Sequence, residues 1–364
     1  MDDPSAGLEM LLANGEHKGS FFKYSSRIYF FQDKSSYFII RIAGFFDLFT
    51  FSTYSSTALF FALISFIGMW LFFLTFYRRY PHLHRQLAIV CFFIPSVFFW
   101  GSGLLKDTIM MGCLGAATYC FDALLIRRSF SVPKVLVLLM CLFVIFSVKK
   151  FILQAFLPCI LLWVYLSYVD RIQSRALRAI ILPFVLAIIG VSGYYAVVKV
   201  GEGDSRYSVE KIAYTARETA IDISMLTGRD AGSTYTLGDL DGTMSGMVKL
   251  APQAINVSLF RPYIWEVRNP LMLLSALESL AMLLLTINII IRKRAGLLRT
   301  LGKPDIVFCL AFAIIYAFAV GVSTFNFGTL ARYKIPLLPF FGLALVLSYY
   351  ENKESTVDEL EVTE

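Results

Sequence analysis

Long apolar runs separated by short basic or polar stretches dominate the chain. A helix that crosses a bilayer needs about 20 consecutive apolar residues. Nine runs reach or approach this length, and the second and fourth are short enough for tilted or re-entrant helices. The predicted spans cover residues 55–77, 86–101, 104–126, 133–148, 151–169, 179–199, 270–291, 304–325 and 330–349. The pattern predicts an all-α, polytopic membrane helix bundle of about nine transmembrane helices.

Two further segments have helical patterns outside these spans. Residues 36–51 are apolar but carry Arg41 and Asp47, which suits a helix that lies in the outer membrane interface. Residues 208–226 repeat apolar positions at helical spacing and predict an amphipathic helix. The chain then divides into an N-terminal segment, six spans, a long loop, three spans and an acidic tail that we expect to be disordered. These segments are residues 1–54, 55–199, 200–268, 269–349 and 350–364.

The Lys and Arg residues between the spans predict the orientation, because short cytoplasmic loops are enriched in them. The loops on one side hold fourteen such residues and those on the other side hold five. The basic loops are residues 78–85, 127–134, 171–178 and 292–303. We assign these loops and the C-terminus to the cytoplasm, so that residues 1–54 and 200–268 are extracytoplasmic.

The predicted outer position of residues 1–54 needs a means of export. No basic region followed by an apolar segment is visible in this stretch, so we expect no signal peptide within it. We therefore expect the natural start to lie upstream of Met1, with a further helix there. The alternative is that the first span draws a short N-terminal tail across the membrane.

Composition agrees with a membrane protein and excludes other classes. The chain is 57% hydrophobic and 16% charged, whereas soluble domains are about 25% charged. Its formal net charge of +7 resides in the loops between the spans, where it indicates topology and lipid contact and not nucleic-acid binding. The six cysteines lie in apolar runs without a CxxC pair, and the three histidines form no metal-ligand pattern. We expect neither a metal nor a cofactor.

Charged residues at the outer ends of the spans are the candidate functional positions. A charge within the membrane costs about 2.5 to 3.5 kcal/mol unless it is paired or hydrated. In residues 95–109 (PSVFFWGSGLLKDTI), a Gly-Ser-Gly turn precedes Lys106 and Asp107. The helix start beside Lys106 could bind an anion, or Asp107 could offset the helix dipole alone. Lys149 and Lys150 form a second outer turn, where they either snorkel to lipid phosphates or attract a phosphorylated lipid substrate.

Residues 259–268 (LFRPYIWEVR) form a third candidate position. They combine Arg261, Glu266 and Arg268 with tyrosine and tryptophan rings. A guanidinium fork suits phosphate oxygens and aromatic faces suit sugar rings. An ordinary aromatic anchor with an Arg-Glu pair explains the same residues.

The start of the last span is the fourth candidate position. In residues 330–341 (LARYKIPLLPFF), Arg332 and Lys334 precede a helix that two prolines distort. Glu278 lies about two turns below the outer surface, and we expect it to pair with Arg332 or another cation and not to relay protons. Outer carboxylates could activate an acceptor hydroxyl. The available ones are Asp2, Asp3, Asp33, Asp47, Asp204, Asp230, Asp239 and Asp241.

The segments PSVFFWGSGLLKD, LFRPYIWEVRNP and LARYKIPLLPFF resemble bacterial C-type glycosyltransferases and O-antigen polymerase-like proteins, which use polyprenyl-phosphate-linked sugars. The resemblance extends over most of the chain from about residue 36. In the C-type transferases a catalytic aspartate follows the first helix, and the resemblance carries this role to Asp2 and Asp3, which no helix precedes here. In the polymerase-like proteins, outer cations hold the lipid pyrophosphate. Their counterparts would be Lys106, Arg261, Arg268 and Arg332.

Two functions follow from these observations. The first is transfer of a sugar from a polyprenyl-linked donor, on the extracytoplasmic side of a bacterial inner membrane, by a protein that contacts lipids and other polysaccharide-assembly proteins. The second is a non-catalytic transporter or assembly subunit for the same lipid-linked glycans. No duplicated halves are visible and the charges lie at the outer rim, which favours the enzyme. We expect the four outer cations to converge within about 8 to 10 Å of one cavity center, the range of one Debye length.

Overall fold

The computed structural model describes most of the chain outside the 170–211 region. The described residues are 3–13, 15–169, 187, 190, 212–226, 233–238, 241–293, 296, 300 and 302–361. They form helices joined by turns, and their one β-type pairing is an isolated bridge between Thr234 and Asn326. Asp2 and almost all of the predicted span 179–199 lie outside these residues.

The N-terminal half contains the first five predicted spans and the helices that precede them. Its helices are α1 (Pro4–Leu12), α2 (Phe22–Ser25), α3 (Lys34–Thr50), α4 (Tyr54–Tyr77), η1 (Pro81–Leu83), α5 (His84–Phe92), α6 (Pro95–Trp100), α7 (Lys106–Phe121), the π-helical η2 (Asp122–Ile126), α8 (Val132–Val148) and α9 (Lys150–Val169). The C-terminal half follows the 170–211 region. Its helices are α11 (Ile212–Leu226), α12 (Met244–Lys249), α13 (Ala251–Phe260), η5 (Ile264–Glu266), α14 (Pro270–Lys293), α16 (Pro304–Ser323), α17 (Phe327–Tyr333) and α18 (Leu337–Glu361).

The described helices define an all-α membrane protein. Five are long and apolar enough to cross a bilayer: α4, α7 with η2, α9, α14 and α16. A sixth span results if Phe327–Tyr333 and Leu337–Tyr350, which meet at a bend of 68°, are one broken crossing. The count of nine is therefore not reached among these residues.

One predicted span differs from the expected single helix, and another is as short as the sequence indicates. Residues 86–101 divide into α5 and α6, because Pro95 begins α6 and disfavours helical backbone at the residue before it. Residues 133–148 form α8, which has 17 residues and is shorter than the other candidate spans. Hydropathy finds both segments and the short length of α8, but it does not detect the break before Pro95.

The helices predicted outside the spans are present where they are described. The expected interfacial segment 36–51 is α3, in which Arg41 faces the carbonyls of Leu11 and Ala13 at 3.4 Å each. The amphipathic segment 208–226 is described from Ile212 onward, as α11. α18 continues into the expected disordered tail as far as Glu361, since Glu and Lys favour helical backbone.

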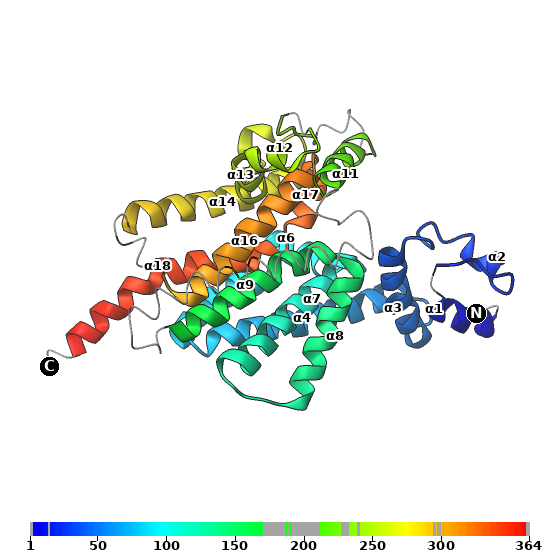
Figure 1. The fold of residues 1–364 in the computed structure, drawn as a ribbon, viewed down its shortest axis with the longest axis horizontal. Helices are drawn as coiled ribbons and strands as arrows, with labels where there is room; N and C mark the ends of the chain where they lie inside the picture. Colours follow the sequence, from blue (N-terminus) through cyan, green and yellow to red (C-terminus); the bar gives the residue numbers. More distant parts are fainter. Residues whose placement is uncertain are drawn as a thin grey trace.

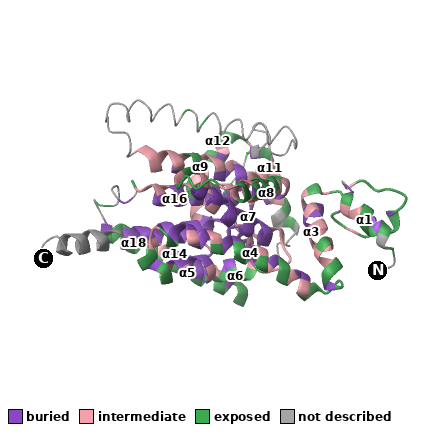
Figure 2. Ribbon diagram, turned by 90° about the horizontal axis from the view of Figure 1, so that it is seen from below, coloured by how far each residue is buried: buried purple, intermediate pink, exposed green. Residues whose placement is uncertain are grey.

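Helix α7 lies at the center of the bundle. Figure 1 shows α1 to α3 at one end of the molecule and the C-terminus at the other, with α4, α7, α9 and α16 between them. In the most apolar part of α7, 72% of the residues are buried, compared with 28% in α14. Buried residues accordingly concentrate along the central helices in Figure 2. The apolar part of α14 is therefore more exposed than that of α7.

Glycines bring α4 and α7 into close contact. A Cβ atom placed on Gly68 would lie 1.9 Å from the carbonyl oxygen of Gly112, and one on Gly115 would lie 2.3 Å from the carbonyl oxygen of Gly68. Small residues let helix backbones approach in this way when lipid supplies no hydrophobic drive for association. The contact fixes the position of α7 and therefore of the residues at its two ends.

We predict that Gly68→Ala lowers the stability of the folded protein by about 1 to 3 kcal/mol, because the added methyl group forces α4 and α7 apart. The matched control is Gly7→Ala in α1, where an added Cβ meets nothing within 4 Å. The control should be neutral or slightly stabilising. All six cysteines are buried, so a thiol-reactive dye in detergent would report the unfolding temperature of each variant. Equal unfolding temperatures would contradict the close packing.

Candidate functional site

A buried carboxylate at the start of α7 binds cations from two other parts of the chain. Asp107 lies in the first turn of α7 and is fully buried. Lys149, at the junction of α8 and α9, forms an ion pair with its Oδ1 atom. Arg332, in the last turn of α17, donates from Nε to Oδ2 at 2.5 Å. Both carboxylate oxygens therefore have a cationic partner.

Lys149 is enclosed almost as fully as Asp107. Its side chain is 9% exposed, and its Nζ atom lies 4.4 Å from the ring center of Tyr333 and 5.8 Å from that of Phe151. An ammonium group loses most of its hydration in such a position, so it requires a carboxylate partner and gains from the aromatic faces. Snorkelling to lipid headgroups does not describe Lys149.

Lys106 extends this arrangement towards the N-terminal helices. Its Nζ atom lies 3.5 Å from Oδ2 of Asp33 and donates to the hydroxyl of Ser35 at 3.1 Å. Asp33 also caps α3 by accepting from the backbone N–H groups of Ser35 and Ser36. Partial burial would raise the pKa of Asp33, but the Ser36 hydroxyl and the Lys106 charge outweigh it and hold the pKa below its ordinary value. Asp33 is therefore ionised at neutral pH.

We call these five residues the Asp107 cluster. Its members are Asp33, Lys106, Asp107, Lys149 and Arg332. They contribute three positive and two negative charges, so the cluster has a surplus of one positive charge. Arg332 is 31% exposed and uses only Nε on Asp107, and its two terminal amino groups make no hydrogen bond to the described residues. The cluster can accept an anion through this guanidinium group.

Arg261 and Glu266 form a separate pair. Nε of Arg261 donates to the two oxygens of Glu266 at 3.1 and 3.0 Å, and the guanidinium lies over the rings of Tyr235 and Phe327 at 5.6 and 5.3 Å. The bond to Glu266 raises the pKa of Arg261. Burial would raise the pKa of Glu266, but Arg261 and the N–H of Tyr263 lower it overall. The charge of Arg261 is thus already neutralised.

Lys334 is buried and forms hydrogen bonds within the protein. Its Nζ atom donates to the hydroxyl of Ser279 at 3.0 Å and approaches the carbonyl oxygen of Arg261 at 3.5 Å. Glu278 accepts from the backbone N–H of Ser96 at 2.8 Å and interacts electrostatically with Lys334. We expected Glu278 to pair with Arg332 or another cation. Arg332 binds Asp107 instead, and Lys334 is the cation that interacts with Glu278.

The remaining predicted site residues that the structure describes take no part in the ion pairs of the Asp107 cluster. Asp3 is exposed and caps α1, and hydrogen bonds from the Ser5 hydroxyl and the Ala6 backbone lower its pKa. Lys150 lies 5.1 Å from the ring center of Phe146. Arg268 is exposed and forms no ion pair within the described part of the chain. Of the four cations expected to converge, Lys106 and Arg332 share the cluster, Arg261 is paired elsewhere and Arg268 has no ion pair there.

A second charged cluster, at the opposite end of α7, was not anticipated from the sequence. We call it the Asp122 cluster, and its members are Arg79, Tyr80, Asp122, Arg127, Trp163 and Asp305. Arg79 bridges Asp122 and Asp305, and Arg127 donates to Asp122 at 2.5 Å. Asp122 interrupts an apolar run, and an acid in that position was the available signal. Two acids and two arginines balance, which indicates a structural role.

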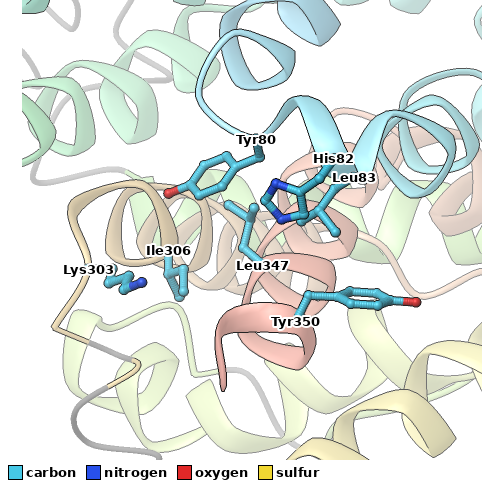
Figure 3. A pocket seen from close by; sticks show the side chains of 7 residues that line it. All are labelled: Tyr80, His82, Leu83, Lys303, Ile306, Leu347 and Tyr350. Carbon is cyan, nitrogen blue, oxygen red and sulfur yellow. The ribbon is translucent and has the colours of Figure 1, made fainter. Parts of the chain in front are cut away.

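Two concave features lie away from the residues of the Asp107 cluster. Figure 3 shows a pocket of about 10 Å³, which has room for about one water molecule. Its lining residues are Tyr80, His82, Leu83, Lys303, Ile306, Leu347 and Tyr350. A groove of about 470 Å³ between α4 and α5 is lined mainly by aromatic rings, including Phe66, Trp70 and Phe92, and suits lipid chains. The first pocket is too small for a sugar, and the groove has few of the polar groups that would orient one.

Comparison with known proteins identifies no relative. No family model matches the chain, and no curated protein or solved structure shows significant similarity to it. Within the described residues, no three His, Cys, Asp or Glu side chains group as a metal site would require. The candidate site therefore depends on the geometry of the Asp107 cluster.

We predict that Asp107→Asn lowers the stability of the folded protein by about 3 to 5 kcal/mol, because it leaves two cations without their shared counter-charge. The matched control is Asp33→Asn, in a half-buried pair, which should cost less than about 1 kcal/mol since Asn also caps helices. Adding Lys149→Met to Asp107→Asn should recover part of the loss. Unfolding temperatures in detergent would measure all three, and equal values for the two single variants would contradict the assignment.

Proposed function

We propose that the protein is a membrane glycosyltransferase that uses a polyprenyl-phosphate-linked sugar. The observation that carries this proposal is the position of Arg332, whose Nε is fixed on a buried carboxylate while its terminal amino groups remain open. A guanidinium group held in this way presents a planar fork to phosphate oxygens. The resemblance of the surrounding segments to polyprenyl-dependent transferases gives the same substrate class.

The reaction requires charge stabilisation more than covalent catalysis. The acceptor hydroxyl attacks the anomeric carbon while the bond from that carbon to the phosphate oxygen breaks. The electron pair leaves with the lipid phosphate, whose added negative charge Arg332 and Lys149 stabilise. Because Asp107 holds both cations in place beforehand, little reorganisation accompanies the transfer.

A carboxylate must receive the proton of the acceptor hydroxyl, and Asp33 is placed best for this role. It is ionised, lies in the same cluster as Arg332 and is 35% exposed. Asp3, by contrast, is engaged in capping α1. The assignment of Asp2 and Asp3 from the resemblance remains a prediction.

The lipid carrier defines where the protein works. A polyprenyl chain keeps the donor in the bilayer, so the phosphate must meet the Asp107 cluster at the membrane surface. The distribution of basic loops supports an extracytoplasmic position for this end of the molecule. The resemblance to bacterial transferases supports a bacterial inner membrane. Membrane lipids and other polysaccharide-assembly proteins are its expected partners there.

We predict that purified protein transfers sugar from at least one member of a panel of polyprenyl-linked donors. Arg332→Lys should reduce kcat/KM about ten- to a hundredfold, because it retains the charge beside Asp107 but loses the terminal amino groups. The matched control is Arg292→Lys in the last turn of α14, where Arg292 contacts Tyr349 at 2.7 Å, and its activity should not change. Movement of lipid-linked glycan across proteoliposomes without transfer would instead support a transporter.

We also predict the orientation of the protein. Ser26 and Ser129 are exposed, and the native cysteines are buried, so single cysteines at these two positions can be labelled selectively. A membrane-impermeant maleimide should label Ser26→Cys in intact spheroplasts and Ser129→Cys only after permeabilisation. The reverse result would place the Asp107 cluster in the cytoplasm and overturn the extracytoplasmic reaction.

A further inference from the structure

The hydroxyl of Tyr316 is buried without a hydrogen-bond partner. Tyr316 lies in α16 and is fully buried, and its ring stacks with Phe151 and Phe312 at centroid distances of 5.7 and 5.5 Å. The hydroxyl oxygen neither donates nor accepts a hydrogen bond within the described residues. A buried polar group left in this state costs about 1 to 3 kcal/mol.

Packing does not account for this hydroxyl. Phenylalanine would keep both ring contacts of Tyr316 and would avoid the cost of the unpaired group. The two rings that stack with it, Phe151 and Phe312, carry no polar atom, so the site tolerates apolar rings. The oxygen of Tyr316 therefore indicates contact with a group outside the folded chain.

The neighbours of the hydroxyl show where that group would lie. Tyr316 interacts electrostatically with the carboxylate of Asp107 and the hydroxyl of Tyr333. Lys149 lies over the rings of both Tyr333 and Phe151, and Phe151 is the residue that stacks with Tyr316. Tyr316, Phe151 and Tyr333 thus form an aromatic wall beside Lys149 and Asp107.

The charges beside Tyr316 favour an anionic ligand. Both oxygens of Asp107 are already occupied by Lys149 and Arg332. A second acceptor with negative charge would be attracted by the surplus positive charge of the cluster, and a phenolic O–H can donate to it. Phosphate oxygens meet both requirements.

We propose that the Tyr316 hydroxyl donates a hydrogen bond to a phosphate oxygen of the polyprenyl carrier when that phosphate is bound by Lys149 and Arg332. The proposal rests on the proposed function and adds a binding residue from α16 to it. It also implies that the phosphate enters past the exposed side of Arg332 and reaches the buried part of the cluster.

The test uses the full-length protein in nanodiscs, with polyprenyl monophosphate as the probe. We expect Tyr316→Phe to weaken its binding about tenfold or more, as for loss of a hydrogen bond to a charged group, and to leave the unfolding temperature unchanged or higher. The matched control is Tyr80→Phe, which removes a hydroxyl that donates to Asp305 at 3.0 Å at the opposite end of the bundle. This control should lower the unfolding temperature and leave binding unchanged.

The outcomes separate this proposal from the proposed function. If the wild-type protein binds the probe and transfers sugar, but Tyr316→Phe binds equally well, the role of Tyr316 is rejected and the function stands. If Tyr316→Phe is less stable than the wild type, the hydroxyl has a structural partner and the proposal fails. If the wild-type protein neither binds nor transfers, both proposals fail.

Parallel titrations distinguish the source of the phosphate. Inorganic phosphate and phosphatidylglycerol in nanodiscs are added in place of the polyprenyl probe. Binding that depends on Tyr316 only with the polyprenyl probe supports the proposal. The same dependence with inorganic phosphate or phosphatidylglycerol alone would assign the site to a soluble anion or to a structural lipid and would overturn it.

Discussion

The counter-charges of one buried carboxylate determine the arrangement at one end of this bundle. Asp107 is separated in sequence by 42 residues from Lys149 and by 225 from Arg332, yet both donate to it. A carboxylate without solvent cannot remain ionised unless cations of this kind surround it. The need to neutralise Asp107 therefore holds three segments together: the start of α7, the junction of α8 and α9, and the end of α17. The Lys149 side chain and the aromatic rings around it follow from this constraint.

The sequence predicted much of the fold because helical membrane proteins follow simple rules. Apolar runs located the helices, and alternation of the spans assigned Lys106, Asp107, Lys149 and Arg332 to one end, where the structure brings them together. The pairing among them could not be predicted. Arg332 pairs with Asp107 and not with Glu278 because of the bend between α17 and α18. The prolines in this segment indicate a distorted helix but do not predict the direction of the bend. Breaks within apolar runs were missed because hydropathy averages over them.

The two charged clusters give α7 a defined position along its whole length. At its start, Asp107 binds cations from two other segments, and beyond its end Asp122 binds Arg79 and Arg127. Between them, glycines hold the helix against α4. The Asp122 cluster is internally balanced, whereas the Asp107 cluster has a surplus positive charge. This difference in net charge distinguishes the candidate binding site at the Asp107 cluster from the structural Asp122 cluster. Burial and the sequence pattern do not distinguish them as well.

Lys334 and Arg332 are neighbouring cations with different roles, one structural and one available to a ligand. Their positions in the sequence do not reveal this difference. Lys334 lies in the break between α17 and α18. Its hydrogen bonds to Ser279 in α14 and to the carbonyl of Arg261 at the end of α13 connect this break to both helices. Arg332 lies two residues earlier, so the same anchoring fixes the direction from which its guanidinium approaches Asp107. A fully buried ammonium group therefore positions the partly exposed guanidinium that remains open to a ligand. Both residues are costly in a membrane, but only the exposed one can exchange water for phosphate.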